Sequence, residues 1–217
     1  MEIEAKYFIF DMDGLMIDSE KLAYNIWKEE MEKDGYELSL DFYKSMIGIP
    51  DNNMIEKFYS EYGKNFDFNK YSNKYQERRD IIYNTIGVDL KLGVIEILNY
   101  LKNNNKKLAV ATSSCREIVD VILKKNNIYN YFDYFVTCED VENHKPEPDV
   151  FLKAIDLANI KKEDSIIFED SENGLKAAYK ANIRSIFIKD MVEPSREVLD
   201  TIYYRAESLV DVIKFIK

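Results

Sequence analysis

The chain has 217 residues, of which 46% are hydrophobic and 32% charged, with only 7 Gly and 4 Pro. These values predict a folded globular protein that is one large domain or a domain carrying an insertion, and they exclude a chain dominated by disordered linkers. The formal net charge of −10 argues against nucleic acid and anionic membranes as partners, because a negative field repels polyanions. A small anionic substrate stays possible, because a bound cation can reverse the sign of one pocket.

The two cysteines, Cys115 and Cys138, lack the spacing of a zinc site, so we expect reduced, partly buried thiols. The N-terminus has no basic segment followed by a long apolar stretch, and no run approaches the roughly 18 apolar residues of a membrane span. We therefore expect a cytoplasmic protein without a membrane partner.

Short apolar runs rich in β-favouring residues recur along the chain, and amphipathic segments separate them. Runs that are apolar throughout predict parallel strands covered on both faces. The predicted fold class is therefore α/β, with a Rossmann-like doubly wound parallel sheet. The five predicted strands are 7–10, 107–112, 134–137, 165–168 and 185–188.

Three of the segments between these strands show helical periodicity, and Pro148 is suitably placed in the first turn of the last one. Each presents one apolar stripe that would pack on the sheet. The three stripes are Val94, Ile97, Leu98 and Leu101; Ile118, Val119, Ile122 and Leu123; and Val150, Phe151, Ala154 and Ile155.

The interval between the first two predicted strands is about ninety residues, whereas a whole βαβ unit needs about thirty, so it must hold an insertion. Four helices are predicted there, with Ser19, Ser39, Asp51 and Asp67 as N-caps. We predict a helical-bundle cap domain over 19–87 and an α/β core domain over 1–18 and 88–217. The expected core of the cap includes Trp27 and the stripe Tyr71, Tyr75, Arg78, Ile82 and Ile86.

An acidic pair, Asp11 and Asp13, follows the first predicted strand. Residues two apart in a strand point to the same side, and like charges that close cost free energy unless a cation or a proton intervenes. Gly14 allows a sharp turn with amide groups open to an anion. Taken alone, so short a motif is more often an aspartate-capped turn than a site.

Polar residues also lie at or after the ends of the second, third and fourth predicted strands: the hydroxyl run 112–114, then Lys145, then Glu169 and Asp170. Each has an ordinary explanation as a helix cap, a surface lysine or acids at the start of a helix. In an open parallel sheet, however, the carboxyl ends of the strands share one crevice where ligands bind. The joint placement therefore favours a single site for a cation and a phosphate.

The stretches "DMDGLMIDS", "ATSS", "KPEPD" and "FEDSENG" resemble, in order, the four motifs of the haloacid dehalogenase superfamily. The resemblance is to the branch with a helical cap inserted after the first motif, and within it to the β-phosphoglucomutase-like group. It covers essentially the whole chain, although the cap is matched by architecture more than by residues.

This resemblance implies Asp11 as the nucleophile that forms an aspartyl-phosphate, and Asp13 as the general acid and base. It implies Mg²⁺ held by Asp11, the main-chain carbonyl of Asp13 and Asp170. Glu169 would be a further ligand or would contact the ligands without binding the ion itself. Lys145 would offset the charge of the nucleophile and the phosphate.

The same resemblance implies that Thr112 and amide groups around Ser113 and Gly14 hold the phosphoryl oxygens, and that Gly48 and Ile49 of the cap take part in substrate choice. The implied function is a Mg²⁺-dependent phosphatase that hydrolyses a small phosphomonoester, such as a sugar phosphate, through an aspartyl-phosphate. The expected partner is thus a small phosphorylated metabolite. The oligomeric state stays open, and a monomer is compatible with the sequence.

Several alternatives remain. A phosphosugar mutase of the β-phosphoglucomutase type is less favoured, because Ala23 and Pro50–Asp51 stand where that group has basic residues. Dehalogenases that resemble this family lack the second aspartate, Asp13. A cap lysine could serve phosphonate hydrolysis, but a solvated helix face explains the cap lysines equally well. A phospho-accepting receiver domain is disfavoured by the long insertion, and the single histidine, His144, is expected to be structural.

Overall fold

The computed structural model describes residues 2–49 and 51–217. The chain divides into two compact units, one formed by residues 1–18 and 89–217 and the other by Ser19–Val88. The predicted insertion, 19–87, has the same first residue as this second unit and ends one residue before it. Within the described residues, no helix has the length and apolar character that crossing a membrane requires.

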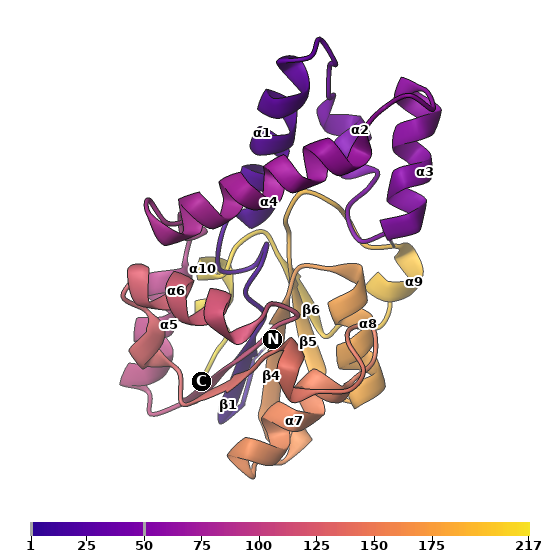
Figure 1. Cartoon of the computed structure of the whole chain (residues 1–217). Coiled ribbons are helices and arrows are strands. Elements are labelled where there is room, and N and C mark those ends of the chain that lie inside the picture. The colour runs from indigo at the N-terminus through magenta and orange to yellow at the C-terminus, as the bar shows by residue number, and fades with distance from the viewer. Residues whose placement is uncertain (1, 50) are drawn as a thin grey trace. The chain divides into compact units, whose positions relative to one another are not determined.

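The first unit is built on a sheet of six parallel strands in the order β3-β2-β1-β4-β5-β6 (Figure 1). This confirms the predicted α/β doubly wound sheet, and all five predicted strands are present. The sixth strand was not predicted, because only Ala206 of its three residues is buried. The strands are β1 Tyr7–Phe10, β2 Lys107–Ala111, β3 Tyr134–Val136, β4 Ser165–Glu169, β5 Arg184–Ile188 and β6 Tyr204–Ala206.

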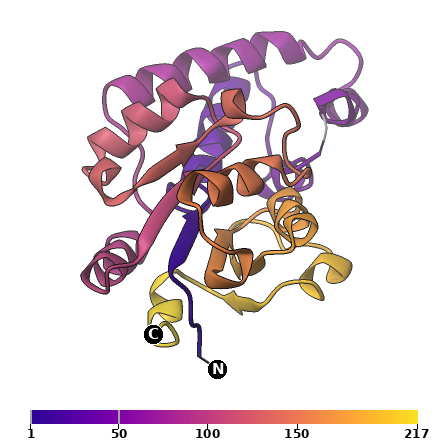
Figure 2. The same ribbon diagram turned by 90° about the horizontal axis from the view of Figure 1, so that it is seen from below.

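Helices cover both faces of this sheet, and Figure 2 shows α5 and α8 on opposite sides of it. Residues Tyr7 and Ile9 of β1 pack with Phe151 and Ala154 of α7 and with Ala178 of α8. The helices of this unit are α5 Val94–Asn103, α6 Arg116–Lys125, α7 Asp149–Ala158, α8 Glu172–Ala181, α9 Arg196–Leu199 and α10 Val210–Ile213, with short 3₁₀ turns at Tyr129–Tyr131, Cys138–Asp140 and Lys162–Asp164.

The predicted helical stripes are confirmed with small differences. The whole stripe of α5 is buried, whereas Ile118 of α6 and Ile155 of α7 are only half-buried. Pro148 is the N-cap of α7, one residue before the helix. Cys115 and Cys138 are free and partly buried, as predicted.

The second unit consists of four helices, α1 Ser19–Glu32, α2 Leu40–Lys44, α3 Asp51–Tyr62 and α4 Phe68–Asn84. Two predicted caps are confirmed, because Ser39 Oγ accepts from the amide of Phe42 at 3.2 Å and Asp67 Oδ1 accepts from the amide of Lys70 at 3.0 Å. Helix α1 begins at Ser19 itself, so Ser19 is in its first turn and not before it. The predictions for Pro50 and the Asp51 side chain lie outside the described residues.

Aromatic rings fill the core of the second unit. Trp27 stacks on Phe58 with ring centroids 5.2 Å apart, and Phe58 stacks on Phe66 at 5.1 Å, which confirms Trp27 as a core residue. The prediction that Ile86 belongs to the buried stripe of α4 is wrong. Helix α4 ends at Asn84, and Ile86 beyond it is 85% exposed.

Residues 16–18, which lead into the second unit, pair with residues 89–91, the returning segment that follows the second unit. The amide of Asp18 donates to the carbonyl of Asp89 at 3.1 Å, Ile17 and Leu90 form an antiparallel bridge, and the amide of Lys91 donates to Met16 at 2.9 Å. Asp18 therefore lies at the boundary between the units, and hydrogen bonds hold residues 89–91 close to the loop after β1.

Candidate active site

The loop after β1 turns sharply at Gly14. The amide of Asp11 donates to the carbonyl of Phe168 at 3.1 Å, which extends the pairing of β1 with β4 as far as the first aspartate. Gly14 has φ +76, and a Cβ there would lie 2.2 Å from Oδ2 of Asp170. Only glycine meets both demands without strain, so its missing side chain lets the loop approach Asp170 closely.

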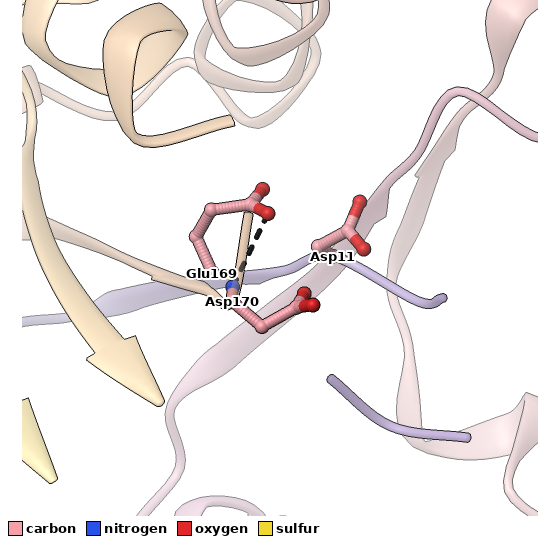
Figure 3. Close-up of side chains that lie close together, drawn as sticks. All are labelled: Asp11, Glu169 and Asp170. Atoms are coloured by element: carbon pink, nitrogen blue, oxygen red, sulfur yellow. Dashed lines mark hydrogen bonds between the residues drawn. The ribbon is translucent and has the colours of Figure 1, made fainter. Parts of the chain in front are cut away.

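Three carboxylates from two neighbouring strands meet at this point. One oxygen from each of Asp11, Glu169 and Asp170 lies within 4.8 Å of the others, and Figure 3 shows the carboxyl groups around a common space. Among the described residues, Oδ1 of Asp170 is buried without a hydrogen-bond partner. A buried, unpaired carboxylate oxygen is costly unless a cation meets it, and hard oxygen donors suit Mg²⁺. The residues therefore fit such an ion.

Burial and crowding raise the pKa of two of these acids. Burial raises the pKa of Asp11 to about 8, with Lys145 acting against it and Glu169 and Asp13 adding to it. Burial, together with the charges of Glu169 and Asp11, raises the pKa of Asp170 well above its ordinary value. A bound divalent cation would favour the ionised carboxylates and so reverse this tendency.

Lys145 reaches into the carboxylate cluster from the loop before α7. Its Nζ lies 2.5 Å from Oδ1 of Asp11 and 2.8 Å from Oε2 of Glu169, and its side chain is only 6% exposed. Burial lowers the pKa of the Lys145 ammonium, but the two carboxylates outweigh this and raise it above the ordinary value. The alternative of an ordinary surface lysine is therefore wrong.

Glu169 is held from both sides. Its Oε1 accepts from the hydroxyl of Ser171 at 2.8 Å and from the amide of Ser171 at 3.0 Å, and its Oε2 accepts from Lys145. A Cβ on Gly174 in the first turn of α8 would lie 2.0 Å from the Glu169 carboxyl carbon. Both oxygens thus already have protein partners, in contrast to Oδ1 of Asp170.

Ser114, the last residue of the hydroxyl run after β2, contacts the loop that carries Asp11 and Asp13, although the sequence gives no reason to prefer it over the other two hydroxyl residues. Thr112 is buried and its Oγ1 accepts from the amide of Ser114 at 3.1 Å, while Ser113 is exposed. The hydroxyl of Ser114 donates to Oδ2 of Asp13 at 2.7 Å. The sequence signal was the run of three hydroxyl residues, but the turn decides which of them reaches Asp13.

Lys91 and Asp190 form a further pair at this edge of the sheet that the sequence does not predict. Asp190, two residues beyond β5, forms an ion pair with Lys91 on the returning segment, and its Oδ2 would lie 3.3 Å from a Cβ on Gly14. The position of Asp190 just after a strand was the only signal in the sequence.

Other predicted site residues lie elsewhere. Gly48 and Ile49 belong to the second unit, where Gly48 has φ +78, and their part in substrate choice stays a prediction. His144 is exposed in the loop before Lys145.

Comparison with known proteins adds a family. The family model described as haloacid dehalogenase-like hydrolase matches residues 8–188. The chain is 27% identical over 179 residues to a phosphorylated carbohydrates phosphatase of Thermotoga maritima, covering 82% of each protein. It is 32% identical over 216 residues to a Caldanaerobacter subterraneus protein with a provisional pyrophosphatase name, covering 96% of this chain and 93% of the relative. A Thermotoga maritima crystal structure provisionally named as a β-phosphoglucomutase is similar with a TM-score of 0.78 at 25% identity, over 99% of both chains.

Proposed function

We propose that this chain, which belongs to the haloacid dehalogenase-like hydrolase family and is a phosphoric monoester hydrolase, acts on a small phosphomonoester such as a sugar phosphate. In this proposal the phosphatase depends on Mg²⁺ and acts through an aspartyl-phosphate on Asp11. The observation that carries this proposal is the contact of the buried Asp11 with Lys145 beside the unpaired oxygen of Asp170. A phosphate dianion can approach an anionic nucleophile only where positive charge offsets the repulsion.

In this proposal, Asp11, Asp170 and the main-chain carbonyl of Asp13 would hold the metal. When bound, Mg²⁺ would supply positive charge that offsets the negative charge of the phosphate and the carboxylates. Both oxygens of Glu169 have protein partners, so we assign Glu169 to orienting Lys145 and Ser171 and not to direct binding of the ion.

The reaction then has two steps on the chain's own residues. An oxygen of Asp11 forms a bond to phosphorus while the ester bond breaks, and Asp13 gives its proton to the leaving oxygen. Water next attacks phosphorus and gives a proton to Asp13 while the bond between the Asp11 oxygen and phosphorus breaks, which regenerates the Asp11 carboxylate and releases inorganic phosphate. Thr112 and the amides around Gly14 and Ser113 hold the phosphoryl oxygens, and Lys145 keeps the carboxylate of Asp11 in place throughout.

Ser114 positions Asp13, so replacing it should slow the chemistry. In Ser114→Ala, Asp13 loses the hydrogen bond to Oδ2, and we expect kcat to fall about tenfold with KM nearly unchanged. Steady-state kinetics with an aryl phosphate would measure this. Ser208→Ala is the matched control, because Ser208 donates a bond of the same 2.7 Å length to Asp211. Equal kcat values for the two variants would contradict the role of Ser114.

A screen of phosphorylated metabolites, each assayed with Mg²⁺ and with EDTA, tests the proposed function. We expect phosphate release from at least one sugar phosphate or similar monoester with Mg²⁺, and loss of that activity in EDTA with recovery when Mg²⁺ returns. Pyrophosphate belongs in the screen because of the name of one relative. Hydrolysis that is undiminished in EDTA would contradict the metal site, and release only from pyrophosphate would contradict the monoester substrate.

A mutase is the second candidate, supported by the provisional name of the similar Thermotoga maritima structure. Mutases of this kind need a second phosphate site, and Ala23 on α1 offers no charge for one. Conversion of β-glucose 1-phosphate with a bisphosphate activator at a rate above hydrolysis would overturn the phosphatase proposal. The cytoplasmic location and the absence of nucleic-acid and membrane partners stay predictions.

A further inference from the structure

The ion pair between Lys91 and Asp190 is unusually well buried. The two side chains are 18% and 11% exposed, and among ion pairs in the described part of the chain only those of Lys145 hold a more buried cation. Such a pair carries a desolvation cost that an exposed pair does not, so it is weak evidence for stability alone.

The pair lies beside the metal-binding carboxylates. Asp190 follows β5 and Asp170 follows β4, which is the neighbouring strand of the sheet. Their Oδ2 atoms flank the same point, because a Cβ on Gly14 would lie 2.2 Å from Asp170 and 3.3 Å from Asp190. Lys91 reaches Asp190 from the returning segment, where its amide is fixed to the carbonyl of Met16.

The charges of the pair act on Asp170 in opposite directions. The largest influences on the pKa of Asp170 are burial and the charges of Glu169 and Asp11, and to these Asp190 adds negative charge while Lys91 opposes it. Oδ1 of Asp170, the buried oxygen without a hydrogen-bond partner in the described residues, is thus under the influence of both.

We propose that Lys91 and Asp190 form a positioning pair that sets how tightly the Asp170 site holds a divalent cation. The proposal rests on the proposed function, since it concerns the same metal site. The negative charge of Asp190 strengthens cation binding, and Lys91 limits that gain and fixes where the Asp190 carboxylate lies. Neither residue takes part in the chemical steps.

Opposite effects of two single substitutions test this pair. Asp190→Asn leaves the Lys91 charge without compensation, and we expect about tenfold weaker Mg²⁺ binding. Lys91→Met leaves Asp190 as an additional negative charge, and we expect binding to tighten by up to about tenfold, with the double variant near the wild type. Calorimetric titration of the full chain with MgCl₂, without substrate, measures all four affinities.

The matched control is the ion pair between Lys6 and Asp164, which lies at the amino ends of β1 and β4 and therefore at the opposite edge of the sheet. Lys6→Met and Asp164→Asn change the net charge by the same amounts, and we expect Mg²⁺ affinity within about twofold of wild type.

A structural tether predicts a different pattern. If both variants of the pair weaken Mg²⁺ binding or leave it unchanged, the inference is wrong, and thermal unfolding without metal would then report a common loss of stability. If Asp190→Asn fails to fold, the tightening expected for Lys91→Met still decides the question. Mg²⁺ binding without phosphatase activity would contradict the proposed function alone. The absence of Mg²⁺ binding would contradict both the proposed function and the inference about Lys91 and Asp190.

Discussion

We expect Asp11→Asn to lower the rate of phosphate release by about ten-thousandfold or more while the protein stays folded. An amide is a poor nucleophile and cannot form the acyl phosphate on which both chemical steps depend. Asn has nearly the shape of Asp and can still accept a hydrogen bond from Lys145, so the buried surroundings of residue 11 are preserved. The measurement is the rate of aryl phosphate hydrolysis with saturating Mg²⁺, together with thermal unfolding of both proteins.

Asp164→Asn is the control for Asp11→Asn. It too removes an aspartate charge that pairs with a lysine, but at the amino end of β4, and we expect a rate within about twofold of wild type. Near-normal hydrolysis by folded Asp11→Asn would exclude Asp11 as the nucleophile.

We expect Lys145→Met to lower both activity and stability. The substitution leaves Asp11 and Glu169 buried without their shared cation, and breaking such a buried pair costs about 3–5 kcal/mol of unfolding free energy. Activity should fall by at least about a hundredfold, because repulsion between the phosphate and Asp11 is no longer offset. Denaturant unfolding without metal measures the stability, and hydrolysis with Mg²⁺ measures the activity.

Two further proteins show whether the loss comes from buried charge. Adding Asp11→Asn to Lys145→Met removes one of the stranded carboxylates, so we expect part of the stability to return. Lys180→Met breaks the exposed pair with Glu147, whose side chains are 43% and 50% exposed, and should cost no more than about 1 kcal/mol. Equal losses for Lys145→Met and Lys180→Met would contradict a buried ion pair at the site.

The strands could be predicted because burial on both faces requires short runs that are apolar throughout. All four residues of β1 are buried and apolar, and in β4, whose five residues are all buried, Ile166, Ile167 and Phe168 form the apolar run. Strand β6 is at the edge of the sheet, where only Ala206 is buried, and its residues carry no comparable pattern. Pairing with β5 decides its conformation, and that pairing is invisible in a local stretch of sequence.

Helix ends were predictable where a side chain fixes them. Ser39 and Asp67 cap α2 and α4 through bonds to amides three residues on, a distance that the sequence displays directly. The end of α4 was misjudged because Ile86 continues the apolar spacing, although the helix stops at Asn84. Periodicity reports which face a residue would take in a helix and gives no information on where the helix ends.

The site was predictable in so far as its residues follow strands. Asp11, Glu169 and Asp170 come together because β1 and β4 are neighbours, and the sequence places these acids at their carboxyl ends. The contact of Ser114 with Asp13 joins residues 101 apart, and that of Lys91 with Asp190 joins residues 99 apart. Each depends on the exact turn after a strand or on the fastening of the returning segment, so neither could be read from spacing.

In the proposed mechanism, Asp11 carries the phosphoryl group during hydrolysis. Mixing the full chain with Mg²⁺ and an aryl phosphate, quenching in acid during turnover, and mapping the peptides by mass spectrometry tests this directly. We expect one phosphoryl group on Asp11 that disappears once substrate is consumed. A phosphoryl group on another residue, hydrolysis with no labelled peptide, or a phosphoprotein that persists for minutes after the substrate is gone would contradict the mechanism.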